Sequence, residues 1–371
     1  MSSISTLLEK ARAEQPLSRE ELTTLLSISD PKNIQALFDC AYEIKTRHVG
    51  KVAYFRGIIE CSNLCTKDCF YCGIRKSNSK VERFEMDEEE MLREALWAFN
   101  ADYGSCVIQA GERSDPAWVD KIERVVRQIR ADTEGKLGIT LSLGEQTEET
   151  YRRWRDAGAH RYLLRVETSN PELYKKLHPA DHHFEERVAC LRRLKQTGWQ
   201  VGTGVMMGLP GQTMEDLADD ILFFQKMDID MIGMGPYIPH TDTPLGKSVP
   251  SYSEAEKKEA LLLGLKMIAV TRIALKDINI AAATALQALE YTGREQGLQC
   301  GANVIMPNVT ETDYRPKYQL YDNKPCLDEN SSMCRGCLSG RIQGIGETVG
   351  FGEWGDAPHY FRRCEAEKAE E

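Results

Sequence analysis

Three cysteines, Cys65, Cys69 and Cys72, lie close together in the chain and are separated by three and then two residues. Thiolates at this spacing can converge on one metal centre, and thiolate is the usual ligand of an iron–sulfur cluster. Because most such clusters are closed by four cysteines, three thiolates leave one iron open to bind and react with a small molecule. The alternative is a zinc knuckle, but structural zinc sites use four protein ligands, so we favour an iron–sulfur cluster.

The cysteine loop also carries an aromatic residue, Tyr71, directly before its last cysteine. A C-x3-C-x2-C loop with this aromatic residue resembles the signature of the radical S-adenosylmethionine (SAM) superfamily. The resemblance implies a four-iron, four-sulfur cluster on the three cysteines. It also implies that this cluster chelates SAM and cleaves it reductively to a 5′-deoxyadenosyl radical.

The composition bounds the class of protein. With 371 residues, of which 42% are hydrophobic and 28% charged, the chain is typical of a soluble globular protein. We find neither a membrane-spanning apolar run nor the blocks of a signal peptide, so we expect a cytoplasmic protein without a membrane partner. The net charge of −10 argues against nucleic acid as a partner, because phosphate backbones select basic surfaces. Twelve cysteines in a cytoplasmic chain indicate metal or redox chemistry before disulfides.

The elements that position these residues follow from the hydrophobic pattern. Ser18 with Glu21 predicts a capping box, and Asp30-Pro31 begins a second helix, so residues 1–50 are predicted to form a helical extension. Short β-like runs then alternate with amphipathic helical segments such as 86–99 and 116–131, which predicts a (β/α)8 barrel of the TIM type. An incomplete barrel of six units is the alternative. The predicted strands are 51–59, 105–110, 137–142, 161–166, 200–206, 231–236, 278–284 and 303–306. We assign residues 51–310 to the barrel and 311–371 to a C-terminal segment.

Residues that could do chemistry follow several predicted strands, where the active sites of such barrels lie. The cysteine loop follows the first strand, and Gln109 and Glu112 lie at the end of the second. Along 161–167, alternation places Arg161, Arg165 and Glu167 on one face of an extended segment. We expect this face to line the cavity of the barrel rather than an exposed edge.

The resemblance extends over roughly residues 50 to 340 and is to one family of the superfamily, the HydE maturases of FeFe-hydrogenase. The strings that carry it occur in order: Cys69-Phe-Tyr-Cys-Gly-Ile-Arg75, Leu141-Ser-Leu-Gly-Glu145, Arg161-Tyr-Leu-Leu-Arg165, Glu167-Thr168, Gly208-Leu-Pro-Gly-Gln-Thr213, Gly235-Pro-Tyr-Ile-Pro-His240 and Cys300-Gly-Ala-Asn-Val-Ile-Met-Pro-Asn308. The resemblance implies that Glu167 holds the ribose hydroxyls of SAM, Arg187 its carboxylate and Glu112 its amino group. Tyr71 and Gln109 complete the expected cofactor-binding set.

The same resemblance implies the substrate and the partners. The substrate would be an organometallic iron complex of carbon monoxide, cyanide and cysteine, converted anaerobically toward the di-iron subcluster of the hydrogenase H-cluster. The implied protein partners are a tyrosine-cleaving maturase that supplies this complex, a GTPase scaffold and a reductant protein. Ala110 and Ala283 stand where we would expect hydroxyl residues. The residues that match the cavity positions of the family are Thr140, Arg165, Thr284, Met306 and Tyr318.

A second cysteine set, Cys326, Cys334 and Cys337, matches the spacing of the family's accessory cluster. We therefore predict a second iron–sulfur cluster there, in preference to idle thiols or adventitious metal. Two other functions stay open. One is a radical SAM enzyme acting on an organic substrate, such as a methylornithine synthase or a biotin synthase. The other is a non-catalytic iron–sulfur scaffold, which would not need Glu167 and Arg187 in register with a SAM site.

Overall fold

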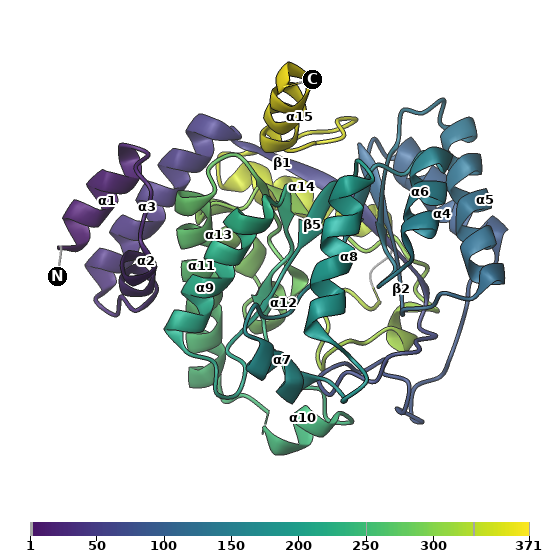
Figure 1. Ribbon diagram of the computed structural model, residues 1–371, viewed down its shortest axis with the longest axis horizontal. Coiled ribbons are helices and arrows are strands. Elements are labelled where there is room, and N and C mark those ends of the chain that lie inside the picture. The colour runs from purple at the N-terminus through teal and green to yellow at the C-terminus, as the bar shows by residue number, and fades with distance from the viewer. Residues whose placement is uncertain (1–2, 250, 329–330, 371) are drawn as a thin grey trace.

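A computed structural model describes residues 3–249, 251–328 and 331–370, and within them parallel strands close into a barrel (Figure 1). Ala281 directly follows the seventh strand of the barrel, and Val304 lies in the eighth. A parallel bridge joins these two residues, so the sheet closes on itself. The predicted (β/α)8 barrel is confirmed, and the six-unit alternative is wrong. In sheet order the strands are β10 (Val304–Ile305), β1 (Val52–Ser62), β2 (Ser105–Ala110), β3 (Gly138–Ser142), β4 (Arg161–Leu163), β5 (Gln200–Thr203), β7 (Met231–Ile232) and β9 (Asn279–Ile280).

Two predicted strands, 200–206 and 231–236, are interrupted. The chain leaves β5 and β7 and then forms a separate short pair, β6 (Met206–Met207) with β8 (Gly235–Pro236). The interruption occurs where two backbones approach closely, since a Cβ atom on Gly204 would lie 2.0 Å from the carbonyl oxygen of Gly233. Only glycine allows this approach.

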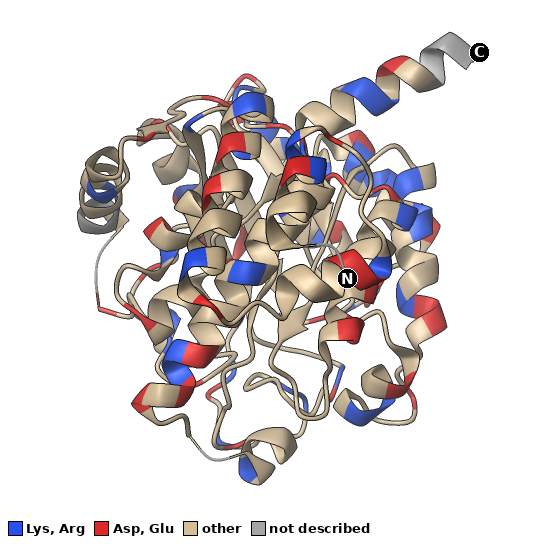
Figure 2. Ribbon diagram, turned by 90° about the vertical axis from the view of Figure 1, so that its left-hand side faces the viewer, with Lys and Arg blue, Asp and Glu red and all other residues tan. Residues whose placement is uncertain are grey.

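Amphipathic helices cover the outside of the barrel, and Figure 2 shows acidic and basic residues interspersed along them. Capping boxes at Asp87, Thr213 and Ser253 begin α4, α9 and α11, because each side chain accepts a hydrogen bond from an otherwise unpaired backbone N–H. No helix in the described ranges is long and apolar enough to cross a membrane. The covering helices are α4 (Glu88–Asn100), α5 (Pro116–Asp132), α6 (Glu148–Ala157), α8 (Phe184–Gln196), α9 (Met214–Met227), α11 (Glu254–Ala274) and α13 (Gly293–Gln299).

The N-terminal helices α1 (Ile4–Arg12), α2 (Arg19–Leu26) and α3 (Pro31–His48) lie to one side of the barrel (Figure 1). The predicted capping box of Ser18 and Glu21 is present, and Asp30 caps α3 as predicted. Helix α3 packs on α11 and α2 packs on α9. These helices therefore extend the outer layer and lie away from the barrel mouth.

The two ends of the barrel are closed differently (Figure 1). Short helices α7 (Pro171–Leu177), α10 (Pro244–Ser248) and α12 (Thr284–Leu289) follow the carboxyl ends of strands, together with the cysteine loop. The chain after η1 (Arg315–Lys317) continues through α14 (Ser331–Gly344), β11 (Thr348–Val349) beside β1, and α15 (Pro358–Glu370) at the opposite end. There Arg56 and Asn279 both donate hydrogen bonds to the carbonyl of Gly355, so the C-terminal segment forms a floor.

Candidate active site

The cysteine loop occupies residues 63–87, between β1 and α4. It is tied to distant parts of the chain, since Phe70 N–H donates to the Leu177 carbonyl and Gly73 N–H to the Leu320 carbonyl. At Gly73 a Cβ atom would lie 2.1 Å from the carbonyl oxygen of Gln319, so the loop packs there backbone to backbone. The guanidinium of Arg83 gathers the loop by donating to the carbonyls of Asn63, Ile74, Arg75, Lys76 and Asn78 at 2.6–3.3 Å.

The loop brings the three predicted thiols together. Burial, and then the charges of Cys69 and Cys65, raise the pKa of Cys72 well above its usual value. The Glu112 N–H donates to Cys65 Sγ over 3.3 Å, as backbone amides do to cluster thiolates. A Cβ atom on Gly111 would lie 2.4 Å from the Leu64 carbonyl oxygen, so a small residue is required beside the loop.

The three thiols match an iron–sulfur cluster by their chemical type. Within the described residues, no group of three His, Cys, Asp or Glu side chains is placed to hold a metal ion. Buried thiols also need positive charge to ionise, and bound iron supplies it. The donor set therefore suits an iron–sulfur cluster with one open corner.

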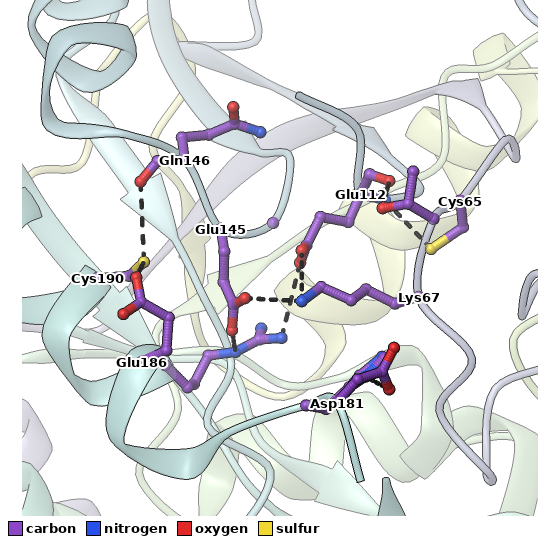
Figure 3. A network of polar contacts seen from close by, with 12 residues as sticks. Cys65, Lys67, Glu112, Glu145, Gln146, Asp181, Glu186 and Cys190 are labelled. Carbon is purple, nitrogen blue, oxygen red and sulfur yellow. Dashed lines mark hydrogen bonds and ion pairs between the residues drawn. The ribbon is translucent and has the colours of Figure 1, made fainter. Parts of the chain in front are cut away.

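Beside the thiols, four charged side chains form the network drawn in Figure 3. Lys67 Nζ lies 2.9 Å from Glu145 and 3.3 Å from Glu112, and Arg187 lies 2.7 Å from Glu145 and 3.7 Å from Glu112. Burial raises the pKa of the Glu112 carboxyl. Burial would also raise the pKa of Glu145, but Arg187 and Lys67 outweigh it and hold that pKa below its usual value. The structure thus brings the predicted Glu112 and Arg187 together.

Glu167 lies on the same side of the barrel in an unusual backbone conformation. Its φ of 65° is in the left-handed region, which non-glycine residues rarely adopt and which clusters at functional sites. Arg165 Nε and Nη2 both donate to one carboxylate oxygen of Glu167, Oε2, at 3.1 and 2.8 Å. Burial, and then the charges of Cys69 and Glu167, raise the pKa of Tyr71 well above its usual value. Glu167 and Tyr71 therefore face the region of the thiols.

The other predicted site residues contact different parts of the barrel. Gln109 Nε2 donates to the hydroxyl of Tyr318 at 3.3 Å, on the side of the cysteine loop. Thr284 accepts a hydrogen bond from Arg294 at 2.9 Å where α12 begins. Met306 packs on an inward-facing apolar cluster of Met231, Ala281 and Val304.

Thr140 lies deeper, near the floor of the barrel. Its hydroxyl accepts a hydrogen bond from Arg161 Nε at 3.0 Å, and both side chains are buried. Arg161 continues to the C-terminal floor, where it pairs with Asp356 at 2.5 Å. The face expected to line the cavity is therefore interior. Arg161 contacts the C-terminal floor, whereas Arg165 pairs with Glu167 at the mouth.

The accessory cysteine set is only partly described. Cys326 has a left-handed φ of 63°, and its sulfur accepts from Gln287 Nε2 at 3.8 Å. Cys337 is exposed on α14. The side chain of Cys334 lies outside the described residues.

Sequence reasoning missed several residues of the site. Lys67 lies in the cysteine loop and Glu145 ends one of the motif strings, but only the folded chain brings their side chains together. His178 was also missed: its Nδ1 contacts the Tyr174 carbonyl at 2.9 Å and its Nε2 lies 3.5 Å from the Tyr71 hydroxyl. Burial lowers the pKa of His178 to about 3, so the ring is neutral and steadies Tyr71 without adding charge.

Comparison with known proteins decides the family. Residues 59–224 match the sequence profile of the Radical SAM superfamily. The [FeFe] hydrogenase maturase subunit HydE of Thermotoga maritima is 45% identical over 358 residues, which are 96% of this chain and 98% of that protein. The chain belongs to the HydE family of radical SAM enzymes. A 3-methylornithine synthase of Methanosarcina acetivorans is 26% identical, with 89% of each chain covered.

Solved structures agree on the fold of this HydE-family chain. Methylornithine synthase (PylB) matches with a TM-score of 0.79 at 24% identity, covering 93% of this chain and 98% of that one. The maturase HydG of Carboxydothermus hydrogenoformans matches with a TM-score of 0.78 at 20% identity, covering 94% of this chain and 79% of that one. At these identities the likeness concerns the barrel alone.

Proposed function

We propose that this chain is a radical SAM maturase of FeFe-hydrogenase whose substrate is an iron complex carrying carbon monoxide, cyanide and cysteine. The observation that carries the proposal is the 45% identity to the T. maritima maturase subunit across 96% of the chain. Membership of the family implies a 4Fe-4S cluster and SAM. When bound, the cluster supplies the electron for the reductive cleavage of SAM.

The chain's own residues divide the work of holding SAM. Cys65, Cys69 and Cys72 hold the cluster. Arg187 holds the methionine carboxylate through charge-assisted hydrogen bonds, and Glu112 accepts from the amino group. Since Arg165 uses only Oε2 of Glu167, the other carboxylate oxygen can accept from the ribose hydroxyls. The remaining members of the cofactor-binding set are Tyr71 and Gln109.

The proposed substrate pocket combines hydroxyl groups with one guanidinium. Arg165 at the mouth donates N–H groups suited to cyanide nitrogen and to a carboxylate. Its pairing with Glu167 at 2.8 Å supports a substrate pocket next to the proposed SAM site. The other proposed pocket residues are Thr140, Thr284, Met306 and Tyr318.

The wider biology is proposed on the same basis. The proposed organisation has a helical extension over residues 1–50, a barrel over 51–310 and a C-terminal segment over 311–371. An accessory cluster would be held by Cys326, Cys334 and Cys337. The protein would act in the cytoplasm. Its partners would be the tyrosine-cleaving maturase that supplies the iron complex, the GTPase scaffold and a reductant protein.

An omission experiment tests the proposal. Apo FeFe-hydrogenase is activated anaerobically with the iron complex, SAM, reductant and the other maturation factors, with or without this protein. We expect hydrogen evolution to require the protein and all three loop cysteines. If SAM is cleaved but the hydrogenase stays inactive, the substrate assignment is wrong and an organic substrate takes its place. If SAM is never cleaved, the non-catalytic scaffold is favoured.

A further inference from the structure

The network of Lys67, Glu112, Glu145 and Arg187 is balanced in charge and tightly held. It contains two cations and two carboxylates, and their side chains are only 11–22% exposed. The backbone fixes it further, because the Glu112 side chain packs over Gly144, where a Cβ atom would lie 2.2 Å from Glu112 Cγ. Figure 3 shows Lys67 reaching toward both carboxylates from the cysteine loop.

Stability alone does not account for this network. Removing four charges from water is costly, and buried ion pairs are often no more stabilising than apolar side chains of the same size. Surface ion pairs elsewhere on the chain, such as Arg124 with Glu88, avoid that cost because both side chains are well exposed. A buried set of charges at a proposed ligand site is better explained by recognition of a polar ligand.

The weakest contact in the network lies between the two residues assigned to SAM. Arg187 and Glu112 are 3.7 Å apart, whereas Glu145 holds Arg187 at 2.7 Å and Lys67 at 2.9 Å. A direct bond between Arg187 and Glu112 would satisfy both groups and leave nothing for a ligand. Each of them instead lies closer to an outer partner, Glu112 to Lys67 and Arg187 to Glu145, than the two lie to each other.

We propose that Lys67 and Glu145 are positioning residues that keep Glu112 and Arg187 from pairing closely with each other, so that both can bind the amino acid group of SAM. Glu145 orients the guanidinium toward the ligand carboxylate, and Lys67 holds Glu112 to accept from the ligand amino group. Entry of the ligand replaces the 3.7 Å contact with one partner for each residue. Such preorganisation raises affinity because the protein need not rearrange on binding. The proposal rests on the proposed use of SAM.

The decisive variant removes both outer partners at once. Lys67→Met with Glu145→Gln keeps the net charge and both recognition residues, but lets Glu112 and Arg187 close on each other. We expect the affinity of the anaerobically reconstituted protein for SAM, measured by equilibrium dialysis, to fall about tenfold. Affinity for 5′-deoxyadenosine, which lacks the amino acid group, should not change. A double variant that binds SAM within about twofold of the wild type overturns the proposal.

Controls separate positioning from damage to the loop. Iron content per chain must match the wild type, and loss of both ligands together would indicate a collapsed site and also overturn the proposal. Lys76→Met and Glu149→Gln change exposed residues of the same loop and of α6 and should bind SAM normally. If the wild-type protein itself does not bind SAM, the proposed function fails; if it binds and the double variant is unchanged, only this inference fails.

Discussion

At the scale of single residues, the three loop thiols carry the chemistry. We predict that Cys69→Ser abolishes release of 5′-deoxyadenosine, because a cluster with two cysteines cannot present SAM with an open iron. Cys334→Ser, in the accessory set, should keep most of this activity. Both variants are assayed anaerobically with a chemical reductant and chromatography of the products. A Cys69→Ser protein that still cleaves SAM would place the active site elsewhere.

Glu167 combines a ligand role with a strained backbone. Its φ of 65° costs a residue with a Cβ atom about 1 kcal/mol, and glycine pays no such penalty. Glu167→Gly and Glu167→Ala remove the same carboxylate, so both should weaken SAM binding. We predict that the glycine variant is the more stable of the two by about 1 kcal/mol. Anaerobic thermal unfolding checks this, and equal midpoints would contradict it.

Residue types and local spacing led to the predicted cysteine ligands but not to the residues beside them. The three cysteines stand out by their spacing, and Glu112 and Glu167 by their position after a strand, whereas Arg187 is assigned only through the resemblance to the HydE family. Lys67 and Glu145 could not be paired in advance, because their contact at 2.9 Å joins loops after two different strands. The sequence also could not indicate a neutral His178 beside Tyr71, because the lowered pKa of this ring comes from its burial in the fold.

At the scale of elements, the cysteine loop depends on Arg83. Five carbonyl groups of the loop accept from its guanidinium, so one side chain replaces the regular hydrogen bonds that the loop lacks. We predict that Arg83→Met makes opening of the loop about tenfold more frequent. A chelator should then remove iron about tenfold faster, as followed by absorbance. Lys80→Met, an exposed loop control, should lose iron at the wild-type rate.

Element prediction succeeded where the signals were local. Capping residues and apolar periodicity located helices within residues 1–50 and near 86–99 and 116–131, and each predicted strand position holds a strand. The pattern could not show that 200–206 and 231–236 are each broken. That break depends on Gly204 meeting Gly233, a contact between two strands that the sequence of either strand does not contain.

At the scale of the whole molecule, the C-terminal segment closes the barrel opposite the active site (Figure 1). A Cβ atom on Gly104 would lie 1.6 Å from the Glu353 carbonyl oxygen, so this segment lies directly against the strand ends. Arg161 reaches Asp356 from inside the barrel, and Arg363 of α15 reaches Asp230 at 2.9 Å. Sequence did not predict this floor, because its contacts join the last residues of the chain to several earlier strands.

His359 of α15 makes this closure sensitive to pH. Its Nε2 lies 2.7 Å from Asp228 and its Nδ1 lies 3.5 Å from Asp277, while Lys195 and Arg362 pair with the same two carboxylates. Burial would lower the pKa of His359, but the two aspartates outweigh it and raise the pKa to about 9. Because the folded-state pKa exceeds the unfolded value, protonated His359 stabilises the fold fully below about pH 6.5 and progressively less up to about pH 9.

The contribution of His359 is therefore largest in mild acid and is at most about 3 kcal/mol. We predict that His359→Gln lowers the unfolding midpoint by several degrees at pH 6 and by much less at pH 9.5. The midpoints are measured anaerobically on reconstituted protein across this range. The ion pairs of Lys195 with Asp228 and of Arg362 with Asp277 also hold α15 in place, so the wild type should not unfold at high pH. A wild-type advantage that is the same at both pH values would show that His359 acts by packing and not by its charge.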